Sequence, residues 1–265
     1  MRATVFLGGG RITSALVAGL RQANYRQPIV VHDRHPKKLQ YLKRQYNVIA
    51  ETDLHRAVAS ARILIIAVRP DSVHELLRRI ASHPIRGRLT AVSLVAGIPL
   101  SILRAELGSP VRWARAMPSP VCRTGRGLTA LAFGRGFSIA ARAEVRNMFA
   151  QVGNVIEIPE RQFDAFTVTF SSSNGYHALA ALIDAAEAIG LDRKSARVAA
   201  AHALADGIAS WRTNNLSLEH LLNEAATPGG IAAEVMASLD RAGYSKMVAQ
   251  ALRAGIRQAR RNARI

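Results

Sequence analysis

Three consecutive glycines near the start of the chain are the first residues whose type and spacing point to chemistry. Gly8-Gly9-Gly10 is followed by Arg11-Ile12-Thr13, which fits the pattern G-x-G-x-x with Thr13 where a third glycine or an alanine is usual. Glycine at position 8 permits a tight turn, and glycine at position 10 lets the backbone approach a phosphate closely. A helix that begins here would offer its free N–H groups to the pyrophosphate of a dinucleotide. The alternative is a glycine-rich turn that binds no ligand.

A polar pair at residues 33 and 34 is predicted to select the dinucleotide. Asp33 would accept a hydrogen bond from the ribose 2′-OH of NAD, whereas Arg34, with Lys37 and Lys38 nearby, would bind the 2′-phosphate of NADP. An ion pair between Asp33 and a neighbouring cation, without a role in selection, is the alternative. We expect NADP, with NAD as the second possibility.

A second group of chemically suggestive residues is Thr227-Pro-Gly-Gly230, which interrupts a region rich in alanine and leucine. Proline and glycine both disfavour a helix interior, so the chain must turn here. One interpretation is a plain turn between two helices. The other is a loop whose backbone approaches a ligand, with the Thr227 hydroxyl as a hydrogen-bonding group.

Alternating strands and helices are predicted to position the first group. Short apolar runs at residues 3–7, 28–32, 63–68 and 89–95 are separated by helix-length segments, among them residues 12–20 and 39–46. Such alternation is typical of βαβ units in a doubly wound parallel sheet. We therefore predict an α/β, Rossmann-like dinucleotide-binding domain over residues 1–158.

The pattern changes to helices alone in the last third of the chain. Helical spacing covers residues 163–189, 195–211, 217–224 and 231–261, with interruptions at 171–175, 190–192, 214–215 and 227–230. We predict an all-α domain over residues 159–265 that binds the substrate. Its abundant apolar helical surface also predicts a homodimer or a higher homo-oligomer.

Composition excludes several other classes of protein. The net charge is +18, but the arginines are scattered and aromatic residues are only 5% of the chain, so nucleic-acid binding is not expected. The basic stretch at residues 257–265 is predicted to be a solvated helix end. Apolar runs are too short for a membrane span, and the first residues lack the pattern of a secretory signal. A single cysteine, Cys122, and histidines without metal-ligand spacing predict no metal site, and we expect a cytoplasmic protein.

Six short segments in collinear order resemble the pyrroline-5-carboxylate reductase family. The glycine turn with the helix after it, Ile66-Ala-Val-Arg-Pro70, Ala96-Gly-Ile98, Arg115-Ala-Met-Pro118, Gly153-Asn-Val-Ile-Glu157 with Phe163-Asp-Ala165, and Thr227-Pro-Gly-Gly230 are similar to family segments. The resemblance implies hydride transfer from a reduced nicotinamide to the C=N bond of a five-membered cyclic imine. It therefore implies reduction of pyrroline-5-carboxylate, or a close analogue, to proline.

The resemblance also implies which residues form the site. The residues implied to bind the cofactor are Gly8, Gly10, Arg11, Ile12, Asp33, Arg34, Ala67, Val68, Pro70, Met117 and Ser119. Those implied to contact the imine are Tyr176, Thr227, Gly229, Gly230, Ile231 and Ala232. Thr227 is the implied catalytic residue, because its hydroxyl stands where the family usually has serine.

Several positions depart from the family pattern. Ala232 replaces a threonine, Ser119-Pro120 replaces Asn-Thr, and the segment Ser171 to Tyr176 differs from the family's S-G-S-G-P-A-Y. The cofactor half is thus better kept than the substrate half. This difference leaves a second hypothesis open, a non-catalytic or regulatory NAD(P)-binding homologue with an altered substrate site.

Overall fold

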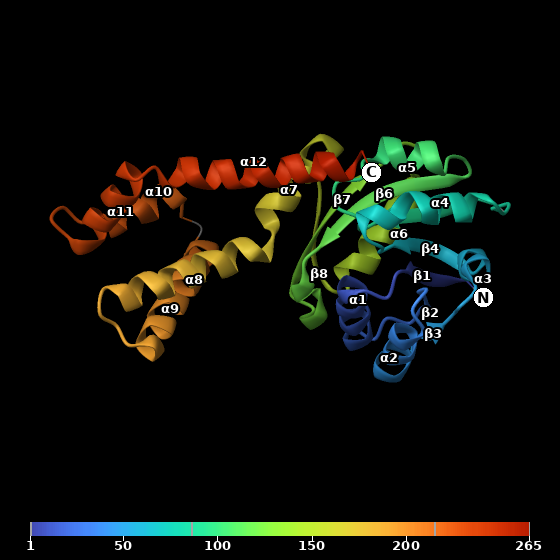
Figure 1. The fold of residues 1–265 in the computed structure, drawn as a ribbon, viewed down its shortest axis with the longest axis horizontal. Coiled ribbons are helices and arrows are strands. Elements are labelled where there is room, and N and C mark those ends of the chain that lie inside the picture. The colour runs from blue at the N-terminus through green and yellow to red at the C-terminus, as the bar shows by residue number, and fades with distance from the viewer. Residues whose placement is uncertain (1, 86, 215, 265) are drawn as a thin grey trace. The chain divides into compact units, whose positions relative to one another are not determined.

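The structure, a computed structural model, describes residues 2–85, 87–214 and 216–264 of the chain (Figure 1). Its residues form two compact units, which are described separately. The first unit comprises Met1–Val168 and Gly255–Ile265, and the second comprises Thr169–Ala254. The boundary between residues 158 and 159 expected from the sequence stays a prediction.

The first unit is built on an eight-stranded sheet with the strand order β3-β2-β1-β4-β5-β6-β7-β8. The strands are β1 (Ala3–Leu7), β2 (Ile29–His32), β3 (Ile49–Ala50), β4 (Ala61–Ile66), β5 (Leu89–Ser93), β6 (Val111–Pro118), β7 (Gly127–Phe133) and β8 (Gly153–Glu157). Strands β1 to β6 pair in parallel, and the order reverses direction between β1 and β4. This is the doubly wound topology predicted from the sequence.

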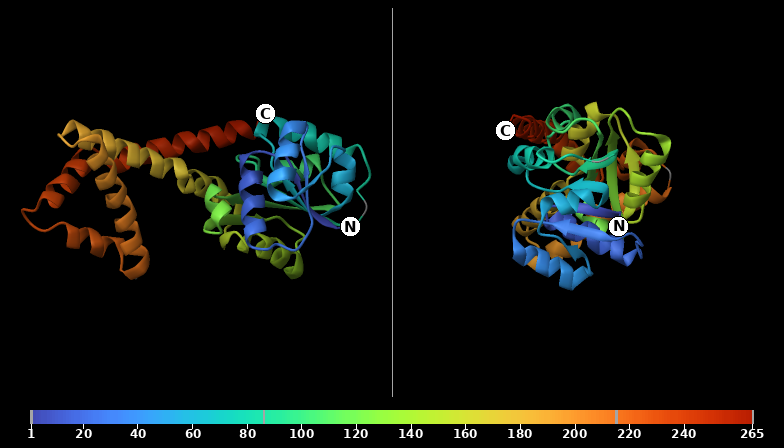
Figure 2. Two further views of the ribbon diagram at one scale, coloured as in Figure 1. Left: turned by 90° about the horizontal axis from the view of Figure 1, so that it is seen from below. Right: turned by 90° about the vertical axis from the view of Figure 1, so that its right-hand side faces the viewer.

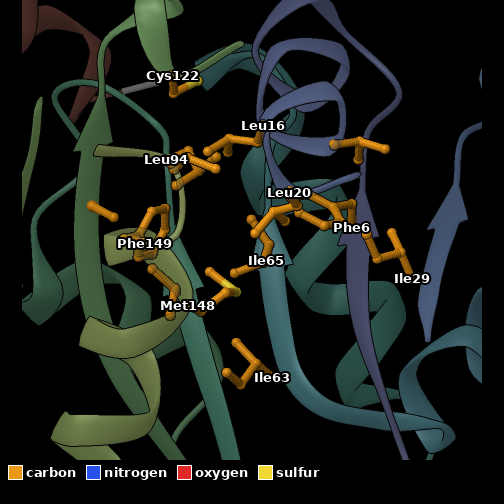
Figure 3. Packing of buried hydrophobic residues seen from close by; sticks show 14 of the residues in the cluster. Phe6, Leu16, Leu20, Ile29, Ile63, Ile65, Leu94, Cys122, Met148 and Phe149 are labelled. Atoms are coloured by element: carbon orange, nitrogen blue, oxygen red, sulfur yellow. The ribbon is translucent and has the colours of Figure 1, made fainter. Parts of the chain in front are cut away.

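Helices cover both faces of this sheet, as Figure 2 shows for the first unit. On one face lie α1 (Arg11–Gln22), α2 (Pro36–Tyr46) and α6 (Ile139–Ala150), and on the other lie α3 (Leu54–Ala59), α4 (Val73–Ala81) and α5 (Leu100–Glu106). The continuous apolar run in β4 follows from this arrangement, because successive side chains of a strand point to opposite faces and both faces are buried. Figure 3 shows Ile63 and Ile65 of β4 among Leu16 and Leu20 of α1 and Met148 of α6.

The last two strands extend the predicted parallel sheet in the opposite direction. Strand β7 pairs antiparallel with β6, and β8 pairs parallel with β7, so both run against the other six. Only the short 3₁₀ helix η2 (Pro120–Thr124) joins β6 to β7. Parallel neighbours need a longer crossover connection, and α6 provides one between β7 and β8.

Helix α7 (Glu160–Phe170) leads from the sheet into the second unit, which contains α8 (Ser172–Ala188), α9 (Arg193–Asn214), α10 (Leu218–Ala225), α11 (Ile231–Arg241) and the start of α12 (Tyr244–Asn262). The single helix predicted over residues 231–261 is wrong, because the chain turns at Gly243, where φ is 73°. The interruption predicted at residues 171–175 is only one residue long in the structure, because α7 ends at Phe170 and α8 begins at Ser172. The Ser171 hydroxyl accepts a hydrogen bond from the Ser173 N–H. Asn215, at another predicted interruption, lies outside the described residues.

The second unit has almost no interior of its own. Among its described residues, only Ala196 and Ala200 of α9 are buried. Helix α8 packs against α9. Large apolar side chains of this unit remain exposed, among them Tyr176, Ile189, Val198, Ile208, Trp211, Leu218, Ile231, Val235, Leu239 and Met247. A single chain therefore leaves an extensive apolar helical surface in contact with water.

Candidate functional site

The glycine turn lies where β1 ends and α1 begins. Gly8 has φ of 110°, and a Cβ atom there would lie 2.5 Å from the Ala67 carbonyl oxygen at the end of β4. The Gly8 N–H donates to the His32 carbonyl oxygen (2.8 Å), and the Ala67 N–H donates to the Leu7 carbonyl oxygen (2.8 Å). The turn is thus fastened to both neighbouring strands, and only glycine fits at its first position.

The helix N-terminus beyond the turn suits an anion. Gly10 is the N-cap of α1, no side chain caps the helix, and its first turn has no acidic residue. The space where a Cβ atom of Gly10 would stand is open. Free N–H groups and the positive end of the helix dipole favour a phosphate at such a place.

Thr13 occupies the position where the glycine pattern usually has a third glycine or an alanine. Its side chain is fully buried, and its hydroxyl donates a 2.6 Å hydrogen bond to the Gly8 carbonyl oxygen. The bond satisfies a buried polar group and ties the first turn of α1 to the glycine turn. The departure from the usual pattern at Thr13 therefore preserves the geometry of the turn.

Asp33, at the end of β2, is engaged within the protein itself. One carboxylate oxygen accepts from the Gly9 N–H (2.7 Å), and the other accepts from the His35 N–H (2.8 Å) and lies 2.8 Å from the His35 Nδ1. Lys38 Nζ lies 3.7 Å from the first oxygen, and the Asp33 side chain is only 8% exposed. Asp33 therefore holds the glycine turn, and its contact with a ribose stays a prediction.

The same contacts explain the acidity of Asp33. Burial by itself raises the pKa of this carboxyl group. The hydrogen bonds from Gly9 and His35, together with the charge of Lys38, outweigh burial and lower the pKa below its ordinary value. Asp33 is therefore ionised at neutral pH.

A cavity of about 350 Å³ opens beside the glycine turn, where β1, β2 and β4 end. Its lining residues are Leu7, Gly8, Gly10, His32, Asp33, Arg34, His35, Lys38, Ala67, Val68, Arg69, Ser72, Glu75, Leu76 and Arg79. The cavity lies at the reversal point of the strand order, where sheets of this topology bind dinucleotides.

Positive charge predominates in the cavity lining. Arg34 follows β2 and Lys38 lies in the first turn of α2, whereas Arg69 follows β4 and Arg79 lies on α4. The lining carboxylates are Asp33, already hydrogen-bonded within the turn, and Glu75. This arrangement suits a ligand that carries several phosphate groups.

Six of the predicted cofactor residues line this cavity: Gly8, Gly10, Asp33, Arg34, Ala67 and Val68. The remaining five, Arg11, Ile12, Pro70, Met117 and Ser119, lie outside its lining. Met117 packs against the buried cluster around Phe163, and Ser119 is buried, with its N–H donating to the Leu128 carbonyl oxygen. The cofactor roles of all eleven residues stay predictions.

Sequence reasoning missed the cavity wall formed after β4. Ser72, Glu75, Leu76 and Arg79 follow a spacing of three, four and seven residues, and all four line the cavity. Residues at this spacing share one face of a helix. The signal was present in the sequence, but recognising it requires knowing that β4 lies next to β1.

The predicted imine residues belong to the second unit. At Thr227-Pro-Gly-Gly230 the Gly230 N–H donates to the Thr227 carbonyl oxygen (2.8 Å), and Gly230 is the N-cap of α11, which no side chain caps. Ile231 is 87% exposed, and Tyr176 on α8 is 70% exposed, so Tyr176 is not buried within its own chain. The stretch is thus a tight turn before a free helix N-terminus. The substrate roles of Tyr176, Thr227, Gly229, Gly230, Ile231 and Ala232 stay predictions.

Two further features bear on the class of site. Within the described part of the chain, no three His, Cys, Asp or Glu side chains gather as a metal site would require. Across the same residues, no helix has the length and apolarity to cross a membrane.

Comparison with protein families places both parts of the chain. Residues 4–97 match the family described as NADP oxidoreductase coenzyme F420-dependent, and residues 160–262 match pyrroline-5-carboxylate reductase dimerisation. The first match covers the glycine turn and every residue of the cavity lining. The second covers helices α7 to α12 and supports a homo-oligomeric protein.

Solved structures of similar fold span nearly the whole chain. Pyrroline-5-carboxylate reductase from Coxiella burnetii has a TM-score of 0.87 at 22% identity, covering 99% of this chain and 98% of that one. Pyrroline carboxylate reductase from Plasmodium falciparum, solved with NADP bound, has a TM-score of 0.85 at 21% identity over 99% and 98% of the two chains. At these identities the likeness establishes the fold alone.

Sequence relatives carry the assignment further. Pyrroline-5-carboxylate reductase from Mycobacterium tuberculosis is 31% identical over 281 residues, covering 96% of this chain and 94% of the relative. The enzyme of the same name from Thermus thermophilus is 32% identical over 94% of this chain and 96% of its own. With this identity over nearly its full length, the chain belongs to the pyrroline-5-carboxylate reductase family.

Proposed function

We propose that this protein reduces pyrroline-5-carboxylate to proline with NADPH. The observation that carries the proposal is the cavity at the reversal point of the sheet, with an open glycine turn and a cationic lining, in a chain of this family. The reduced nicotinamide of NADPH supplies a hydride to the carbon of the C=N bond, and a proton is added to the nitrogen. The protein binds both molecules and stabilises charge.

The residues of the first unit fit the coenzyme. A side chain at Gly8 would collide with β4, and one at Gly10 would enter the open space beside the α1 N-terminus, so this turn fits a pyrophosphate. Arg34 and Lys38 would hold the 2′-phosphate, which distinguishes NADPH from NADH. The preference for NADP, predicted from Arg34 with Lys37 and Lys38 nearby, agrees with this proposal.

The residues of the second unit suit the imine substrate. The free N–H groups at the start of α11, from Gly230 onwards, would bind the substrate carboxylate. Thr227 would hydrogen-bond near the imine nitrogen and help to orient the C=N bond. Both roles are proposals that the departure at Ala232 makes worth testing.

The assembly proposed is a homodimer formed by the second unit. Its exposed apolar side chains are too numerous for a stable surface in water, and contact with a second copy would bury them. A cytoplasmic location stays a prediction from the sequence.

The test of the proposal is a panel of cyclic imines assayed with NADPH and with NADH. Coenzyme oxidation is followed by absorbance, and proline is identified by chromatography. We expect turnover of pyrroline-5-carboxylate with NADPH and slower turnover of pyrroline-2-carboxylate. Tight NADPH binding without turnover of any imine would instead support a non-catalytic homologue.

A further inference from the structure

The connection between β5 and α5 is held at both ends by residues from distant parts of the chain. At residues 96–100, the Ala96 carbonyl oxygen accepts a hydrogen bond from Asn262 Nδ2 at the end of α12 (3.3 Å). The Leu100 N–H donates to a carboxylate oxygen of Glu160 in the first turn of α7 (2.5 Å). All four residues belong to the first unit. This connection is called the 96–100 segment below.

Glu160 is itself fixed by a buried cation. The Arg115 side chain on β6 is 2% exposed, and its Nη1 lies 3.9 Å from the same Glu160 oxygen. Its Nη2 donates to Asp164 (2.7 Å), and its guanidinium lies 4.2 Å from the centre of the Phe163 ring. A buried guanidinium needs such partners, so the first turn of α7 is held firmly against β6.

Asn262 is oriented by a chain of hydrogen bonds along α12. Arg261 donates to Gln258 Oε1 (2.7 Å), and Gln258 Nε2 donates to Asn262 Oδ1 (3.0 Å). The amide oxygen of Asn262 is therefore an acceptor, and its NH₂ group faces the Ala96 carbonyl oxygen. The helix end that looked like a solvated tail in the sequence thus presents one side chain to the sheet.

A second observation places the same helix end on the segment. Gly97 has φ of 82°, and a Cβ atom there would lie 2.5 Å from the Ala259 carbonyl oxygen of α12. The backbones meet so closely that any side chain at position 97 would push them apart. The close approach at Gly97 and the hydrogen bond from Asn262 are thus two independent observations of the contact between the 96–100 segment and the end of α12.

The 96–100 segment lies beyond the cavity in the direction that an extended dinucleotide takes. The cavity is at the ends of β1, β2 and β4, and the next strand in the sheet is β5. The Leu94 N–H donates to the Ile66 carbonyl oxygen (2.9 Å), which keeps the end of β5 beside the end of β4. With its adenosine beside β2, a dinucleotide would extend across the reversal point and place its nicotinamide near the end of β5.

We propose that Asn262 and Glu160 are positioning residues for the nicotinamide half of the coenzyme. They act through the backbone of the 96–100 segment and leave the adenosine half, bound at the glycine turn, unaffected. The inference rests on the proposed use of NADPH, but it concerns binding and is tested without turnover.

The experiment compares the affinities of the intact protein for two ligands, NADPH and 2′,5′-ADP, which carries only the adenosine half. Asn262→Asp keeps the shape of the side chain and loses the N–H donor. We expect it to weaken NADPH binding about five- to tenfold, the effect of about one hydrogen bond, with 2′,5′-ADP binding within twofold of wild type. Arg260→Ala, an exposed neighbour on the same helix, is the matched control and should change neither affinity.

A second pair of variants keeps the test independent of a folding defect. Glu160→Gln retains an acceptor for the Leu100 N–H, whereas Glu160→Ala removes it. We expect Glu160→Ala to weaken NADPH binding more than Glu160→Gln does, with little change in 2′,5′-ADP binding in either variant. The circular dichroism spectra of both variants should match the wild-type spectrum.

Equal weakening of both ligands in Asn262→Asp, or no change in either, would overturn the inference. Failure of the proposed function looks different. Wild-type protein would then turn over no imine, while the variants would still bind NADPH more weakly than wild type and 2′,5′-ADP equally well.

Discussion

The two units of this protein differ in how much of their structure a single chain completes. The first unit buries two large hydrophobic clusters on the faces of its sheet and forms a cavity from its own side chains. The second unit buries only two alanines among its described residues, and it exposes large apolar side chains, Tyr176 and Ile231 of the predicted imine residues among them. A Rossmann-like sheet finds its apolar covering within one chain, whereas these helices require another surface.

From this difference we infer that the two units depend on assembly to different degrees. The coenzyme subsite is formed by strand ends that the core holds rigidly, so its geometry exists before assembly. Thr227, in the turn before α11, and the start of α11 belong to a unit that lacks a core, so we expect their positions to depend on a second copy of the chain. The variants below test this contrast, in order of decreasing expected effect.

Charging the exposed face of α11 should have the largest effect. Val235 and Leu239 are 54% and 46% exposed and stand four residues apart on one helix face. In a two-fold dimer the double variant Val235→Glu/Leu239→Glu removes four apolar side chains from the interface. At about 1.5 kcal/mol each, the dimer dissociation constant should rise by about 10⁴-fold.

Sedimentation equilibrium measures this change. Ile139→Glu, on α6 of the first unit and 89% exposed in wild type, is the control and should leave the dimer intact. A double variant that sediments like wild type would show that α11 does not contribute to the interface. The contrast between the units would then need another explanation.

Removal of the Thr227 hydroxyl should come next. Thr227→Val keeps the shape of the side chain and loses the hydrogen bond proposed near the imine nitrogen. One such contact in a transition state is worth about 10²–10³-fold in rate, so kcat/KM for the imine should fall by that factor. NADPH affinity, measured by fluorescence titration, should stay the same, because the coenzyme subsite lies in the other unit.

The converse substitution sharpens the same point. Ala232→Thr restores the hydroxyl usual in the family and should raise kcat/KM for pyrroline-5-carboxylate if its absence limits turnover. If neither position 227 nor position 232 affects turnover, Thr227-Pro-Gly-Gly230 is a helix–helix turn and nothing more.

Arg34→Ala tests the cationic lining of the cavity and should have a moderate effect. A charged hydrogen bond to phosphate is worth about 1.5–3 kcal/mol, so NADPH affinity should fall about 10- to 100-fold. NADH has no 2′-phosphate, and its affinity should change little. Equal losses for both coenzymes would show that Arg34 does not read the 2′-phosphate.

The smallest predicted effect concerns Asp33 and pH. Because the pKa of Asp33 is lowered in the folded protein, its ionised form stabilises the fold above the unfolded pKa near 4. That contribution is lost as the pH falls through the folded value. Asp33→Asn should therefore cost most unfolding free energy at neutral pH, and the difference from wild type should shrink below pH 4. A constant difference in urea titrations across this range would contradict the assignment.

The strands of the first unit differ in how well they can be predicted from the sequence. The strands β1, β2, β4 and β5 are short apolar runs buried on both faces, and their pattern is legible without a structure. The pattern of strand β6 cannot be recognised from the sequence in this way, because this largely buried strand contains Arg112 and Arg115. Arg115 resembles scattered surface charge until Glu160, Phe163 and Asp164, far along the chain, are seen around it.

The candidate site was predictable to a similar degree. The glycine turn was recognised because its residues are adjacent in the chain and its chemistry is local. The role of Asp33 in fastening that turn and the wall formed by Ser72 and Arg79 depend on which strands are neighbours. In the second unit, alanine-rich helices predict helix packing, but they do not indicate which face meets a partner.

The measurement that tests the central claim most directly is transfer of label from coenzyme to product. The wild-type protein is incubated with pyrroline-5-carboxylate and NADPH carrying deuterium at both C4 positions, and proline is analysed by mass spectrometry. We predict proline one mass unit heavier, with deuterium on the ring carbon that was part of the C=N bond. Unlabelled proline, or no proline while NADPH binds normally, would contradict hydride transfer to this imine.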